Sequence, residues 1–189
     1  MLRFAEITLT HARDATILDF TMSSTLAQLA QSISTSPVHD LAVNWLRNIP
    51  GFPPIVQTVH ILSIGCIMGS IVLIDLRVLG LAVPSQNISE MLRRLMPWVW
   101  ASLLLLFFSG AMFVVARPGR YFANPIFGIK FALLLPAIVL AIVLQYLLKK
   151  NPERRHSVKI IAALSLVLWL GVVMAGRWIA YRDYLFPTE

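Results

Sequence analysis

The sequence predicts an all-α, polytopic membrane protein with a bundle of four transmembrane helices. Of its 189 residues, 58% are hydrophobic and 13% are charged, and the mean hydropathy is +0.75. These values are too apolar for a soluble domain of ordinary composition. The basic residues behind the net charge of +7 fall mostly between apolar runs, where membrane topology alone would put them. We therefore expect the lipid bilayer, and no nucleic acid, as a partner.

Residues 1–53 are predicted to form an N-terminal extension with interfacial amphipathic helices. This stretch has no apolar run long enough to cross a bilayer. We expect one short helix up to Gln31 and a second over residues 36–48, each with an apolar side that suits a membrane surface. Residues 1–21 carry no signal-peptide pattern, so we expect them to be dispensable and Met22 to serve as an alternative start.

Residues 54–182 are predicted to form a four-helix transmembrane domain. Each apolar run is close to the 20 residues that a span requires. We expect the second span to begin at Pro97, because proline is tolerated in the first helical turn. In the first span, Gly65 and Gly69 are expected to allow close contact between helices. The predicted spans are about 54–78, 97–116, 125–148 and 158–181.

Lysine and arginine residues indicate the orientation of these spans, because they are enriched in cytoplasmic links. The links after spans one and three share a side and hold more basic residues than the opposite side does. We therefore expect both termini in the periplasm. The first side holds Arg77, Arg93, Arg94, Lys149, Lys150, Arg154, Arg155 and Lys159, and the second holds Arg47, Arg117, Arg120 and Arg182.

Three ionisable residues, His60, Lys130 and Arg177, lie inside spans at a similar depth in the outer half of the bundle. Such residues are costly in lipid and usually face the bundle interior, a partner or a bound group. Imidazole is a common ligand of haem and of metals. We predict His60 as the anchor of a cofactor site, and Lys130 and Arg177 as a basic pair for a haem propionate or for a quinone or lipid head group. The simpler interpretations are a hydrogen-bonded structural histidine and basic side chains that reach the membrane surface.

Two methionines, Met112 and Met174, lie at the same depth. Thioether sulfur is a soft ligand, so together with His60 they could form a copper site open to the periplasm, or one of them could complete a His/Met haem. Packing is the simpler explanation for a methionine in a membrane helix. The single cysteine, Cys66, excludes an internal disulfide and any multi-cysteine metal site.

A second polar layer lies near the cytoplasmic end of the first span. Asp75 is roughly 22 Å further along the helix than His60, at about 1.5 Å per residue. We predict that Asp75 and Arg77 form a structural ion pair that closes this end of the bundle. A role of Asp75 in a proton relay is the alternative.

Four stretches, VQTVHILSIGCIMGSIVLIDLRVLG, RRLMPWVWA, YFANPIFGIKFALLL and LSLVLWLGVVMAGRWIAY, resemble the signature segments of a family of small four-span bacterial inner-membrane proteins of unknown function. The resemblance implies an inner-membrane location. It also implies that certain residues are typical of the family. These are His60, the turn of Asp75, Leu76 and Arg77, and the basic residues Lys130 and Arg177.

The stretch HILSIGCIMGS is more distantly similar to the histidine span of copper-resistance D-type membrane domains and of HemJ-type haem-containing protoporphyrinogen oxidases. The resemblance to the four-span family implies a second histidine near the end of the third span, where this chain has Gln145 and Tyr146. This difference lowers the case for a bis-histidine haem.

Three classes of function agree with these features. The first is a redox protein that binds haem b or a quinone, and the second is a copper-handling or transport protein. The third is a cofactor-free structural subunit that binds another membrane or periplasmic protein, or a second copy of itself. Absorption, metal content and co-purifying protein would separate the three. The sequence has no nucleotide-binding loop, HExxH motif or recognisable serine nucleophile, so nothing in it indicates a hydrolase.

Overall fold

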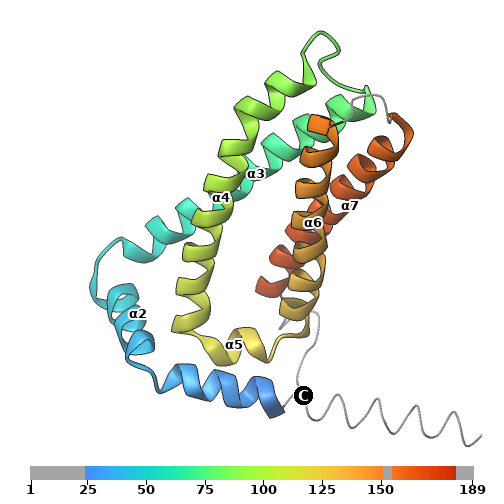
Figure 1. The fold of residues 1–189 in the computed structure, drawn as a ribbon. Helices are drawn as coiled ribbons and strands as arrows, with labels where there is room; N and C mark the ends of the chain where they lie inside the picture. Colours follow the sequence, from blue (N-terminus) through green and yellow to red (C-terminus); the bar gives the residue numbers. More distant parts are fainter. Residues whose placement is uncertain (1–23, 151–154, 182–189) are drawn as a thin grey trace, which may run out of the picture.

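The computed structural model describes residues 24–150 and 155–181, and this part of the chain is helical without strands. A helix over residues 24–34 precedes six labelled helices (Figure 1). The predicted all-α fold with four long apolar helices is confirmed. The segment expected to be dispensable, residues 1–21, lies outside the described residues. The labelled helices are α2 (Pro37–Asn48), α3 (Phe52–Leu79), α4 (Ile88–Ala116), α5 (Pro118–Phe122), α6 (Pro125–Lys150) and α7 (Arg155–Ala180).

The four helices α3, α4, α6 and α7 are each long and apolar enough to span a membrane. Three of them run close to the predicted spans, but α4 begins nine residues before Pro97, at Ile88. The side chain of Asn87 accepts a hydrogen bond from the Ser89 amide at 2.9 Å and caps the helix. Glu90 and Arg94 add an ion pair one turn apart. The prediction that Pro97 starts this helix is therefore wrong, because a polar first section precedes the apolar run.

The helix expected over residues 36–48 is present as α2, and its sequence explains both of its ends. Ser36 caps it by accepting a hydrogen bond from the amide of His39, and Pro37 occupies its first turn. The ring of His39 donates a hydrogen bond from Nδ1 to the carbonyl oxygen of Val115, near the end of α4, at 2.8 Å. Because Ala42 is also buried, α2 is held against the transmembrane bundle.

The bundle consists of two helix pairs. Helix α3 packs along α4, and α6 packs along α7, while α3 and α7 join the pairs. Helices α4 and α6 make few contacts, and Figure 1 shows them diverging towards α5, which connects their ends. We call this the α5 end of the bundle and the opposite one, where residues 80–87 connect α3 to α4, the link end.

The main apolar core lies in the half of the bundle towards the link end. It buries side chains from all four long helices, with Trp169 of α7 among the largest. A smaller apolar cluster of Ile126, Ala175 and Ile179 lies at the α5 end. Buried residues of the main core include Ile67, Ile71, Ile74, Met91, Val99, Ala141, Leu144 and Ala162.

The expected orientation leads to a direct prediction. A periplasm-active reporter such as alkaline phosphatase should be active when fused after Glu189 and inactive when inserted at the exposed residue Ser85 of the link end. A cytoplasm-active fluorescent reporter should give the opposite pattern. A fluorescent reporter that is active after Glu189, together with an inactive phosphatase there, would contradict the prediction and place the C-terminus in the cytoplasm.

Candidate functional site

His60, on the third turn of α3, is half-buried and hydrogen-bonded to α4. Its Nδ1 lies 2.8 Å from the hydroxyl oxygen of Ser109. That hydroxyl also lies 2.6 Å from the carbonyl oxygen of Leu105, which can only accept a hydrogen bond. The serine proton is therefore donated to Leu105, and Nδ1 of His60 carries the proton that is donated to Ser109. This leaves Nε2 as a base with a free lone pair.

The surroundings of the imidazole come from α4 and bring the two helices close together. The ring of Phe113 meets it edge-on, with 6.2 Å between the ring centroids. A Cβ atom added at Gly110 would lie 3.5 Å from Cε1 of His60, at van der Waals contact, so the ring packs directly against this position of α4. Gly65 and Gly69, which we expected to allow close contact, are exposed and have nothing within 4 Å of an added Cβ. Gly110 takes that role instead.

Lys130 of α6 reaches the same layer from the other helix pair. Its side chain is half-buried and lies along α7, where a Cβ added at Gly176 would be 3.8 Å from Cε and 3.9 Å from Nζ. The ammonium group is close enough to His60 for the two to interact electrostatically. Within the described residues it has no hydrogen bond and no ion pair. The structure thus places Lys130 of α6 within electrostatic range of His60 of α3.

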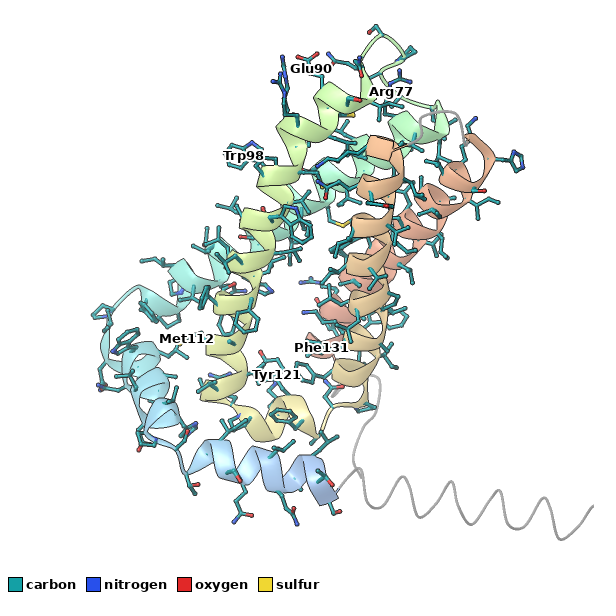
Figure 2. The ribbon with its side chains drawn as sticks, in the orientation of Figure 1. Arg77, Glu90, Trp98, Met112, Tyr121 and Phe131 are labelled. Carbon is teal, nitrogen blue, oxygen red and sulfur yellow. The ribbon has the colours of Figure 1, made fainter. Side chains whose placement is uncertain are left out.

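The other residues predicted for this layer are placed differently. Met174 is 51% exposed on α7. Arg177 is also exposed, donates a hydrogen bond to the hydroxyl of Tyr181 at 2.9 Å and lies over that ring. Met112 is half-buried on α4 and stands at about the height of Phe131 on α6 in Figure 2. No group of three or more histidine, cysteine or acidic residues arranged to bind a metal occurs in the described ranges.

Asp75 and Arg77 lie at the link end and do not form the expected ion pair. Residues two apart on a helix face different directions. Arg77 donates a hydrogen bond through Nε to the carbonyl oxygen of Gln86, at 2.8 Å. Asp75 points into the bundle and is only 1% exposed, and neither of its carboxyl oxygens has a hydrogen-bond partner.

A pocket of about 320 Å³ lies at the α5 end, between α2, α3, α4 and α5. Two arginines line it, and Phe113 contacts both the pocket and the imidazole. At its edge, burial raises the pKa of the Tyr121 phenol, and the charges of Arg120 and Arg117 partly oppose this shift. The pocket can hold an anionic group next to an apolar wall. Its lining residues are Val43, Leu46, Arg47, Pro53, Gln57, Phe113, Ala116, Arg117 and Tyr121.

Ser109, Gly110 and the arginine-lined pocket are not among the site features predicted from the sequence. Ser109 and Gly110 are adjacent small residues inside an otherwise apolar run, which is a typical signal of a helix contact. The two pocket arginines, Arg47 and Arg117, were counted only as topology signals. Their meeting depends on α2 folding back onto the bundle, which no local pattern reports.

A comparison with protein-family models matches residues 51–182, most of the chain, to a family of unknown function, DUF6644. The chain belongs to the DUF6644 family. This confirms the resemblance to an uncharacterised family. No curated protein and no solved structure matched the chain in the corresponding searches. The DUF6644 match contains α3 to α7, and with them His60, Ser109, Lys130 and Asp75, whereas α2 precedes it.

Proposed function

We propose that the α5 end of this membrane protein binds a membrane-soluble redox group, haem b or a quinone, with His60 as the residue that contacts it. The observation that carries the proposal is the state of the imidazole. Its Nδ1–H is donated to Ser109, and Nε2 has no hydrogen-bond partner within the described residues. Histidines that ligate metals are oriented in this way, by a hydrogen bond from the other ring nitrogen.

The residues around His60 suit a haem. His60 would hold the iron through Nε2, and Met112, half-buried on α4, is the remaining candidate for a second ligand. The ammonium of Lys130 and the guanidinium groups of Arg47 and Arg117 can bind propionates. A haem would supply one-electron chemistry, and the residues of this chain would hold it and fix its orientation.

The same residues suit a quinone. Nε2 of His60 can accept a hydrogen bond from a quinol hydroxyl, and Lys130 can donate one to a carbonyl oxygen. Both kinds of ligand combine a flat apolar ring system with oxygen-bearing groups. The layer of His60 and Lys130 offers polar contacts of this kind inside a membrane-spanning bundle.

A copper site receives less support from the placement of its candidate ligands. Copper(I) prefers several soft or imidazole ligands in one place. Met174, at 51% exposure, faces away from the bundle interior that His60 enters. Only His60 and Met112 remain on the α3–α4 pair.

The test is the ligand content of the full chain, purified in mild detergent from a host that makes both haem and quinone. We expect either a haem absorption spectrum that changes on reduction, or close to one quinone per chain in an organic extract. Protein that has neither, together with less than one copper per chain, would contradict the proposal. A stoichiometric amount of copper without haem or quinone would favour the copper-handling alternative.

A further inference from the structure

Three buried polar side chains without partners lie on α3 and α7, the two helices that join the helix pairs. Asp75 is 1% exposed, Ser165 is fully buried and Trp169 is 2% exposed. Neither carboxyl oxygen of Asp75, nor the Ser165 hydroxyl, nor Nε1 of Trp169 has a hydrogen bond. Ser165 and Trp169 are one turn apart on the same face of α7. Ser165 neighbours Asp75, although the two do not reach hydrogen-bond geometry.

Unsatisfied polar atoms in a sealed core are costly, so this arrangement requires an explanation. A buried polar group without a partner costs on the order of 1–3 kcal/mol, and an unpaired charge costs more. The neighbouring side chains, including Ile71, Ile74 and Leu144, are apolar and cannot satisfy the carboxyl group. A small ligand that bonds to all three residues would remove the cost.

We propose that Asp75 is a proton-binding site, which takes up and releases one proton at its carboxyl group while a bound water links it to Ser165 and Trp169. In the protonated state the carboxyl O–H donates a hydrogen bond to the water or to the Ser165 hydroxyl. After release of the proton, the carboxylate accepts hydrogen bonds from that hydroxyl and from the water. Both states then satisfy the polar atoms that lack partners.

The chemistry of the three residues favours a proton over a metal cation. Trp169 supplies only an N–H donor, which a cation would repel. Asp75 and Ser165 together offer three side-chain oxygens, whereas hard cations such as calcium take six or more ligands. A proton needs one acceptor, and the water needs two to four polar partners, which this group of residues provides.

Asp75 lies near the charged groups of the link end, so we expect its proton to be released towards this end of the bundle. The described ionisable groups near this end are exposed or half-buried, and none is hydrogen-bonded to Asp75. Most are positive, so at long range they favour the carboxylate state of Asp75 and disfavour the binding of a metal cation there. These groups are Arg77 on α3, Glu90, Arg93 and Arg94 on α4, Tyr146 and Lys149 on α6, and His156 and Lys159 on α7.

The site is independent of the proposed redox site, because Asp75 lies roughly 22 Å along α3 from His60. Failure of one proposal therefore leaves the other unaffected. A protein with no haem or quinone would still have this buried carboxyl group.

Infrared difference spectroscopy of the full chain in lipid nanodiscs tests the proposal. Between about pH 4 and pH 9, the range in which buried carboxyl groups titrate, we expect a protonated-carboxyl band that disappears as the pH rises. The band should be missing in Asp75→Asn, which keeps the side-chain shape, and should shift in frequency in Ser165→Ala. Ser165→Thr should restore it, and Asp40→Asn, at an exposed aspartate of α2, should leave it unchanged.

Two results would overturn the proposal. One is a spectrum in which Asp75→Asn removes no pH-dependent carboxyl band. The other is a band of Asp75 that responds to sodium at constant pH, which would make the site a cation site. A titrating Asp75→Glu variant with native helical content would support the proposal even if Asp75→Asn does not fold.

Discussion

Replacement of His60 by alanine is expected to remove the bound haem or quinone completely while the protein still folds. The imidazole offers Nε2 without a partner in the described part of the chain, and the side chain of Phe113 and the Gly110 position beside it have no side-chain nitrogen that could replace Nε2. The fold should survive, because Ser109 keeps its hydrogen bond to the carbonyl of Leu105. The measurement is ligand content per chain, with helical content and monodispersity as checks on folding.

Matched variants separate a loss of contact from a general disturbance. His156→Ala removes an exposed histidine at the other end of the bundle and should keep full ligand content. Ser109→Ala should weaken ligand affinity by about 10- to 100-fold, as expected for a residue that orients a ligating histidine. Gly110→Leu should displace the ring, since a Cβ there would already be in contact with Cε1 at 3.5 Å and the branched atoms beyond it would need the space of the imidazole. Unchanged ligand content in His60→Ala would refute His60 as the anchor.

The sequence was sufficient to predict the helical class and the number of apolar helices, because hydropathy reports directly which segments lipid can accept. It failed at the start of α4. A hydropathy pattern detects the apolar run and not the helix, so the polar turns from Ile88 onwards were assigned to a link. The local signal was present, since Asn87 followed three residues later by Glu90 is a typical helix start.

The sequence predicts how deep in the bundle the candidate site residues lie, but it does not predict which side of each helix they occupy. Counting residues from the span ends predicts His60 and Lys130 at one depth, and in the structure the two side chains are within electrostatic range of each other. Depth does not tell which side of a helix faces the bundle. Helix α7 carries apolar residues on several sides, so hydropathy alone does not separate its exposed side, where Met174 and Arg177 lie, from its buried side.

Pairing at the link end was wrong for a similar reason. Asp75 and Arg77 are close in the chain and opposite in charge, which suggested an ion pair. The helix turns them to different sides, and Ser165, which neighbours Asp75, lies on α7, ninety residues later in the sequence. Such contacts depend on how the two helix pairs dock, which no local pattern records.

The second large effect is expected at Trp169, because it is the largest fully buried side chain of the main core. Trp169→Ala should lower the free energy of unfolding by about 3 kcal/mol. This is the lower end of the range for such truncations, since the unfolded state in lipid keeps an apolar surrounding and mainly packing contacts are lost. Unfolding by SDS in mixed micelles measures the change.

Trp98→Ala is the matched control for this substitution. Trp98 is 61% exposed on α4 and lies outside the core, so its removal should change the free energy of unfolding by less than about 0.5 kcal/mol. Trp169→Phe should recover part of the loss, because it refills most of the volume and removes the unsatisfied Nε1–H. Equal losses for Trp169→Ala and Trp98→Ala would mean that the packing of α7 against α3 and α6 is not the main source of stability in the bundle.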